Sequence, residues 1–232
     1  MISRYAIGAV LLALGACGRT ADAPPARATA SPAGETVADS PPGGVAPAVV
    51  FLGTSLTAGL GLDPALAYPA LVQAKIDSAG LHYRVVNAGV SGETSAGALR
   101  RIDWLLRDPP AVLVIETGAN DALRGQNPDS VRANIQAIID RARAITPPPS
   151  IVLVGMEALP NYGPAYVRRF REIYPELAKQ NRIPFIPFLL AGVAGIDSLN
   201  QPDGLHPTAA GQRIVAQTVW KALEPVLRNG RG

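Results

Sequence analysis

Five short apolar runs dominate the chain between residues 48 and 188, and a stretch with helical character separates each run from the next. The runs are rich in Val, Ile, Leu and Phe and show no alternation of apolar and polar residues, which is typical of strands buried on both faces of a parallel sheet. They cover residues 48–52, 83–87, 111–117, 151–155 and 184–188. The other stretches predict helices over residues 68–78, 95–107, 128–145, 164–179 and 208–227. This alternation indicates a single doubly wound, flavodoxin-like α/β domain over residues 48–232, with a five-stranded parallel sheet and helices on both faces.

The composition of the 232 residues excludes several other classes of protein. Apolar residues make up 48% and charged residues 17%, so the chain can bury a sizeable core. A nucleic-acid-binding protein is expected to carry a dense basic stripe with stacking aromatics, whereas the formal net charge here is +3 and aromatics are 5%. The single cysteine, Cys17, and the two histidines, His82 and His206, exclude an intrachain disulfide framework and disfavour a structural zinc site. We therefore expect no nucleic-acid partner and no metal.

Residues 1–16 have the pattern of a signal peptide. Arg4 precedes an apolar run that is about half the length needed to cross a bilayer. Residues 14–17, Leu-Gly-Ala-Cys, are similar to a bacterial lipobox, which implies that Cys17 is acylated and becomes the mature N-terminus. The alternative is an ordinary cleaved signal, which would leave a reactive unpaired thiol. The lipobox reading predicts a protein anchored by its N-terminal lipid in the bacterial cell envelope, on the periplasmic side of the outer membrane because Gly18 replaces the Asp associated with inner-membrane retention.

Residues 17–47 are predicted to be a tether that carries the lipid-attachment cysteine. The segment is rich in Ala, Pro, Gly and Ser and contains no aromatic residue, so it has too little apolar area to offset the entropy of ordering the chain. Its length corresponds to about 30 Å as a flexible coil and about 90 Å as an extended polyproline helix.

Small and polar residues gather where the predicted strands end. Open α/β sheets bind ligands beyond the carboxyl ends of their strands. Four segments lie at such positions or before the last helix: residues 53–59, 87–93, 118–121 and 203–207. Their candidate functional residues are Ser55, Gly89, Asn120, and Asp203 with His206. Each segment alone is equally compatible with a turn or a helix cap. All four segments are expected at the same edge of one sheet, and this shared location favours a functional site.

These four segments resemble the four blocks of the SGNH, or GDSL-type, hydrolase family, in the same order and at similar spacing over residues 48–227. The likeness is closest to the branch of periplasmic thioesterases, lysophospholipases and arylesterases, and extends to residues 68–71, 91–95, 123–125 and 160–163. One position departs from the family pattern, because Thr54 replaces the usual Asp between glycine and serine.

The resemblance implies a Ser-His-Asp triad made of Ser55, His206 and Asp203. In such a triad the imidazole takes the serine proton and the carboxylate holds the imidazole in the required tautomer. The resemblance also implies an oxyanion hole formed by the backbone N–H groups of Ser55 and Gly89 and the side-chain amide of Asn120. No cofactor or metal is implied.

The resemblance and the residue chemistry also suggest roles for residues outside these four segments. By resemblance, Leu123 and Leu159 line the acyl pocket. His82 is a competing base, but it precedes the second predicted strand and is expected at the opposite edge of the sheet. Glu116 interrupts an apolar strand and needs hydrogen-bond donors if buried, so we expect a structural polar link near the site. Arg124 is compatible both with steering an anionic head group and with a solvated loop.

The sequence thus predicts a serine esterase or thioesterase that hydrolyses aryl esters, short to medium acyl esters, lysophospholipids or acyl thioesters through an acyl-enzyme. Two alternatives remain open. One is a carbohydrate O-deacetylase, and the other is a lipoprotein without catalytic activity that binds glycan or lipid in the same cleft.

Overall fold

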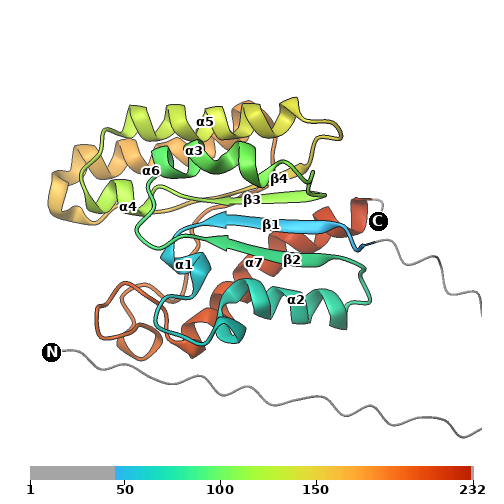
Figure 1. Cartoon of the computed structure of the whole chain (residues 1–232). Helices are drawn as coiled ribbons and strands as arrows, with labels where there is room; N and C mark the ends of the chain where they lie inside the picture. The colour runs from blue at the N-terminus through green and yellow to red at the C-terminus, as the bar shows by residue number, and fades with distance from the viewer. Residues whose placement is uncertain (1–44, 231–232) are drawn as a thin grey trace, which may run out of the picture. The chain divides into compact units, whose positions relative to one another are not determined.

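The computed structural model describes residues 45–230, which contain one five-stranded sheet in which all paired strands are parallel (Figure 1). The strand order is β2-β1-β3-β4-β5. The strands are β1 (Ala48–Gly53), β2 (Arg84–Gly89), β3 (Val112–Glu116), β4 (Ser150–Val154) and β5 (Phe185–Ile186). This order places β1 between β2 and β3. The sheet therefore grows from β1 in one direction to β2 and in the other direction to β3, and such a switch point is where open α/β sheets bind ligands.

Helices cover both faces of the sheet (Figure 1). Helices α3 (Ser95–Leu105), α5 (Pro128–Ala144) and α6 (Gly163–Asn181) pack side by side on one face, and α2 (Tyr68–Ser78) and α7 (Ala209–Asn229) on the other. The predicted doubly wound α/β fold is confirmed. Five short helical segments in the loops were not predicted: α1 (Ser55–Ala58), η1 (Pro64–Leu66), α4 (Ala119–Leu123), η2 (Pro160–Tyr162) and η3 (Asp197–Leu199).

The five predicted long helices agree with the structure to within two residues at every boundary. A capping side chain or a proline in the first turn marks the start of each one. For example, the Asn127 side chain accepts a hydrogen bond from the backbone N–H of Asp129, and Pro128 occupies the first turn, where no N–H is needed. Strand β5 is shorter than predicted. Pro184 and Pro187 flank it, and proline has no N–H to donate to a ladder.

The prediction that every strand is buried on both faces is wrong for β2. Strands β1 and β3 are buried along their whole length, whereas no residue of β2 is fully buried. The reason is position, since β2 is an edge strand and β1 and β3 lie inside the sheet.

Both ends of the described chain lie near the amino ends of the strands. Strand β1 begins at Ala48, and the Tyr83 hydroxyl, just before β2, hydrogen-bonds to the carbonyls of Leu227 and Gly230 at the end of α7. The loops that follow the strands lie at the other edge.

The predicted signal peptide, Cys17 and the predicted tether up to residue 44 lie outside the described residues; residues 45–47 form neither helix nor strand. Within residues 45–230, no helix combines the length and apolar character that spanning a membrane requires.

Candidate active site

A serine near the start of the domain's sequence and a histidine near its end lie close together beyond the carboxyl end of β1. Ser55 is the first residue of α1 and is separated from the end of β1 by Thr54 alone, and His206 lies in the loop before α7. Ser55 Oγ is 2.8 Å from His206 Nε2, and His206 Nδ1 is 2.6 Å from Asp203 Oδ2. The structure therefore brings together the three side chains expected from the sequence. Both contacts are satisfied when Nδ1 carries the imidazole proton and Nε2 accepts the serine hydroxyl.

The carboxylate of Asp203 is held in its ionised form. Oδ1 accepts hydrogen bonds from the backbone N–H groups of His206 (3.0 Å) and Leu205 (2.9 Å), and Oδ2 faces the imidazole. These two backbone donors, followed by the His206 side chain, lower the pKa of Asp203 to about 2. The group is thus a permanent hydrogen-bond acceptor for the imidazole at neutral pH.

The loop that carries His206 is closed by its own backbone contacts. Asn200 and Pro207 form an antiparallel bridge, the N–H of Gln201 donates to the His206 carbonyl (2.7 Å), and the N–H of Thr208 donates to the Leu199 carbonyl (2.8 Å). These bonds fix the imidazole relative to the start of α7.

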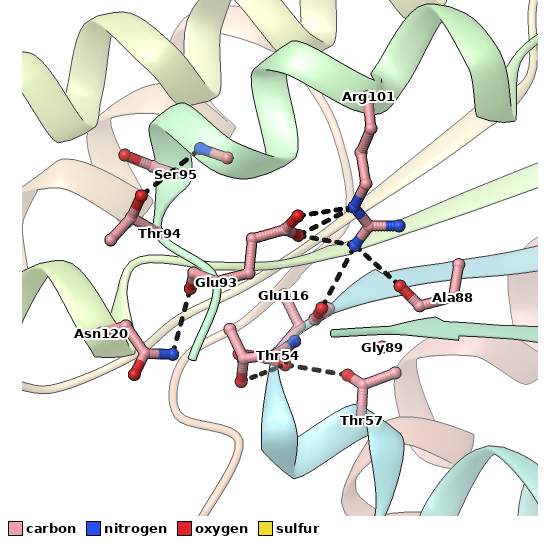
Figure 2. Close-up of polar contacts among 12 residues, drawn as sticks. Thr54, Thr57, Ala88, Gly89, Glu93, Thr94, Ser95, Arg101, Glu116 and Asn120 are labelled. Atoms are coloured by element: carbon pink, nitrogen blue, oxygen red, sulfur yellow. Dashed lines mark hydrogen bonds and ion pairs between the residues drawn. The ribbon is translucent and has the colours of Figure 1, made fainter. Parts of the chain in front are cut away.

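Glu116 anchors the segment that carries the serine. Its side chain is fully buried at the end of β3 and accepts hydrogen bonds from the Thr54 N–H (2.7 Å), the Thr54 hydroxyl (3.0 Å) and the Thr57 hydroxyl (2.8 Å) (Figure 2). Burial raises the pKa of Glu116, and the hydrogen bonds oppose that rise. Gly53 is required here because a Cβ would lie 2.8 Å from Glu116 Oε2 and even closer to Thr57. The expected structural polar link is present, with Thr54 as a member.

The structure does not support Gly89 as an oxyanion donor. Strand β2 extends two residues beyond its predicted end, so Gly89 lies within the sheet, paired with Gly53. Its N–H donates to Asn87 Oδ1 (3.0 Å), and it is not among the residues that line the cavity at Ser55. The sequence prediction placed this glycine in a loop because it ended the strand too early.

The glycine of the loop after β2 that lines the cavity is Gly92. It is the third residue of the turn from Val90 to Glu93, which is closed by a hydrogen bond from the Glu93 N–H to the Val90 carbonyl (3.2 Å). Its φ of +77° is that of a type II turn, which favours glycine at this position. The hydrogen bonds found among residues 45–230 include none donated by the Gly92 N–H. The sequence does contain an indication of this turn, because a second glycine, Gly92, follows Gly89 within the same loop segment.

Asn120 lies in the first turn of α4 and also lines the cavity. Its Nδ2 donates one hydrogen bond to the Glu93 carbonyl (3.0 Å), which leaves the second amide hydrogen for another acceptor (Figure 2). Ser55, as the first helical residue of α1, likewise has an N–H without an intrahelical partner.

A cavity of about 570 Å³ opens beside Ser55 and His206. Its wall is mainly apolar, and both Leu123 and Leu159 contribute to it, as expected. These two leucines are 41% and 46% exposed, so both side chains are accessible to a ligand in the cavity. Further apolar side chains in the wall come from Leu60, Met156, Phe188, Leu190 and Leu205.

Two residues considered from the sequence lie elsewhere. His82 is exposed, precedes β2 at the amino edge of the sheet and does not line the cavity. Arg124 is exposed, and its guanidinium donates a hydrogen bond to the Gly92 carbonyl (3.0 Å) in the turn from Val90 to Glu93.

Comparison with known proteins gives concordant matches. Residues 51–214 match the profile of the GDSL-like lipase/acylhydrolase family. The chain is similar to Esterase TesA of Pseudomonas aeruginosa, with 41% identity over 180 residues (77% of this chain and 89% of that protein). It is also similar to thioesterase 1/protease 1/lysophospholipase L1 of Escherichia coli K12, with 34% identity over 182 residues (78% and 85%). The crystal structure of TesA superimposes with a TM-score of 0.73 at 39% identity, covering 77% of this chain and 99% of that one.

Proposed function

The chain belongs to the GDSL-like lipase/acylhydrolase family, and from this premise we propose that it is a serine esterase or thioesterase with Ser55 as its nucleophile. The observation that carries the proposal is the 2.8 Å contact between Ser55 Oγ and His206 Nε2 at the wall of an apolar cavity. A serine hydroxyl becomes an effective nucleophile when a neighbouring base removes its proton.

The reaction follows from these contacts in two halves. His206 Nε2 takes the Ser55 proton while Oγ bonds to the acyl carbon, and the bond from that carbon to the leaving oxygen or sulfur then breaks as His206 returns the proton to the leaving group. A water molecule, deprotonated by His206, next attacks the acyl carbon and releases the acid and the free serine. Asp203 stabilises the imidazolium formed in each half.

Three hydrogen-bond donors are proposed for the negative oxygen of the tetrahedral intermediates: the N–H groups of Ser55 and Gly92 and the side-chain amide of Asn120. All three residues line the same cavity. Donors held in place before the reaction stabilise the developing charge without reorganisation, and removal of one typically costs about 10² to 10³ in rate.

The apolar wall favours esters with an apolar acyl chain, with Leu123 and Leu159 among its binding residues. An O-deacetylase needs room for an acetyl group and polar contacts to a sugar, which the leucine-rich wall does not favour. We therefore propose short to medium acyl esters and thioesters as substrates.

The test is an acyl-chain panel on the full chain: p-nitrophenyl esters from acetate to dodecanoate, beside matching acyl thioesters. Turnover is expected to peak above acetate and to fall by at least about 10³-fold in Ser55→Ala. A sharp maximum at acetate would favour the O-deacetylase. Unchanged turnover in Ser55→Ala would remove the assignment, and absence of labelling by a fluorophosphonate would favour a binding protein.

We also propose that lipid on Cys17 holds the protein on the periplasmic side of the outer membrane. The support is the signal-like segment that ends in Leu-Gly-Ala-Cys and the absence of Asp at position 18.

The anchor is tested by fractionating cells that express the full chain or Cys17→Ser. The unsubstituted protein is expected in the outer-membrane fraction with an acylated N-terminal peptide in mass spectra, and Cys17→Ser is expected to lose both the acyl mass and the membrane association. Equal fractionation of the two forms would contradict the proposal.

A further inference from the structure

Glu93, the residue after the proposed oxyanion donor Gly92, forms a partly buried ion pair with Arg101 (Figure 2). Arg101 on α3 contacts both carboxylate oxygens of Glu93: Nε lies 2.7 and 2.9 Å from them, and one terminal nitrogen lies 2.6 Å from Oε2. The side chains are 21% and 10% exposed, unlike the other Arg–carboxylate pairs of residues 45–230, in which at least one partner is more than one-half exposed. A bidentate, sheltered pair fixes its geometry far better than an exposed one.

Arg101 also joins this carboxylate to the ends of two strands. The same terminal nitrogen donates to the Ala88 carbonyl in β2 (2.8 Å) and lies 3.4 Å from the Gly53 carbonyl at the end of β1. Gly53 in turn accepts the N–H of Val90, the first residue of the turn (2.9 Å). The guanidinium thus ties Glu93 to the strand end from which Ser55 emerges.

The backbone of Glu93 contacts the other two donors. Its N–H closes the turn that presents Gly92, and its carbonyl accepts the first amide hydrogen of Asn120. A displacement of Glu93 would therefore move Gly92 and release Asn120 together.

Helix α3 does not depend on the pair for its attachment. The N–H and hydroxyl of Ser95 donate to the buried Asp121 carboxylate (2.8 and 2.7 Å), and Thr94 caps the helix. Loss of the pair should free the Glu93 backbone locally and leave the helix docked.

We propose, on the basis of the proposed function, that the Glu93–Arg101 pair positions the oxyanion hole, setting Gly92 and Asn120 relative to Ser55. Neither side chain touches the reacting atoms, so both are positioning residues. Their effect falls on the transition state, because a displacement of about 1 Å in such donors costs up to about 10²-fold in rate.

The first test is Arg101→Gln in the full chain, assayed with the best ester of the panel. We expect kcat to fall by about 10- to 100-fold with KM changed by less than about threefold, and Arg101→Lys to recover part of the loss. Arg141→Gln is the matched control. Arg141 also pairs with a carboxylate of α3, Asp103, and with a carbonyl of that helix, Leu99, but it lies on α5 and contacts none of the site. Its kcat should stay within about twofold.

The second test is a double-mutant cycle with Asn120→Ala. If Arg101 acts by positioning Asn120, adding Arg101→Gln to Asn120→Ala should cost clearly less than it costs alone. A multiplicative loss, a rise in KM alone, or a kcat for Arg101→Gln equal to that of Arg141→Gln would each overturn the inference.

Thermal unfolding of every variant separates positioning from instability. Should Arg101→Gln be unfolded at the assay temperature, Glu93→Gln takes its place. This variant keeps the length of the side chain and removes the charge that holds Arg101, so the same kcat loss is expected. Fluorophosphonate labelling of the unsubstituted chain and its loss in Ser55→Ala report on the proposed function independently. Labelling that is intact while kcat is insensitive to residues 93 and 101 would contradict this inference alone.

Discussion

At the scale of single residues, the backbone around Asp203 decides the protonation of the triad carboxylate. Asp203 is nearly half exposed, yet two backbone N–H groups and the imidazole keep its pKa at about 2. Because this folded-state pKa lies below the ordinary value of 3.8, the stability it contributes is present above about pH 4 and is lost as the pH falls toward 2. Between pH 4 and 9 its charge is constant, so it adds no step to the pH profile of activity.

Replacement of Asp203 by Asn is expected to reduce kcat/KM by about 10³- to 10⁴-fold across that range. The amide can still accept the two backbone hydrogen bonds through Oδ1, but its NH₂ group then faces His206 Nδ1 and favours the tautomer whose Nε2 carries the proton and cannot accept from Ser55. Kinetics on the purified variant, with its melting temperature as control, check this. A loss below tenfold would contradict the orienting role.

At the scale of elements, α1 is docked by one buried carboxylate. Thr54, where relatives are expected to have Asp, donates its hydroxyl to Glu116 from 3.0 Å, and this helps to satisfy a carboxylate that has no exposure to solvent. The hydroxyl therefore has a structural role that a second acid would change.

Thr54→Asp is expected to destabilise the protein increasingly as the pH rises. It places a second carboxyl group against Glu116, and two neighbouring carboxylates raise each other's pKa. A raised folded-state pKa gives stability that is present at acidic pH and lost as the pH rises through that pKa. Melting temperatures at pH 5 and pH 8, with Thr54→Ser as the control that keeps the hydroxyl, measure the effect. An equal difference from the unsubstituted protein at both pH values would refute it.

Most helices and strands could be predicted from the sequence. The apolar runs and helix caps predicted the main elements, and the motif order predicted which loops hold Ser55 and His206. The end of β2 could not be predicted, because the small uncharged residues Ala88 and Gly89 are compatible with either a strand or a loop. For this reason the sequence analysis assigned the oxyanion donor to Gly89, whereas the structure favours Gly92. Nor did the spacing of Glu93 and Arg101 indicate a contact, since they are eight residues apart across a turn and a helix start.

At the scale of the whole molecule, the strand order β2-β1-β3-β4-β5 assembles the site from segments that are distant in the sequence. Ser55 and His206 are 151 residues apart, and the other two donors, Gly92 and Asn120, come from the loops after β2 and β3, on either side of β1. Only the complete sheet brings these loops together, so we expect hydrolysis to be lost together with global unfolding.

Both ends of the described chain lie near the amino ends of the strands, whereas the cavity mouth lies beyond their carboxyl ends. A bead or an electrode coupled through residues 45–47 or through Gly230 would therefore leave the substrate entrance facing the bulk liquid. Preparations immobilised at either end of residues 45–230 should keep their turnover.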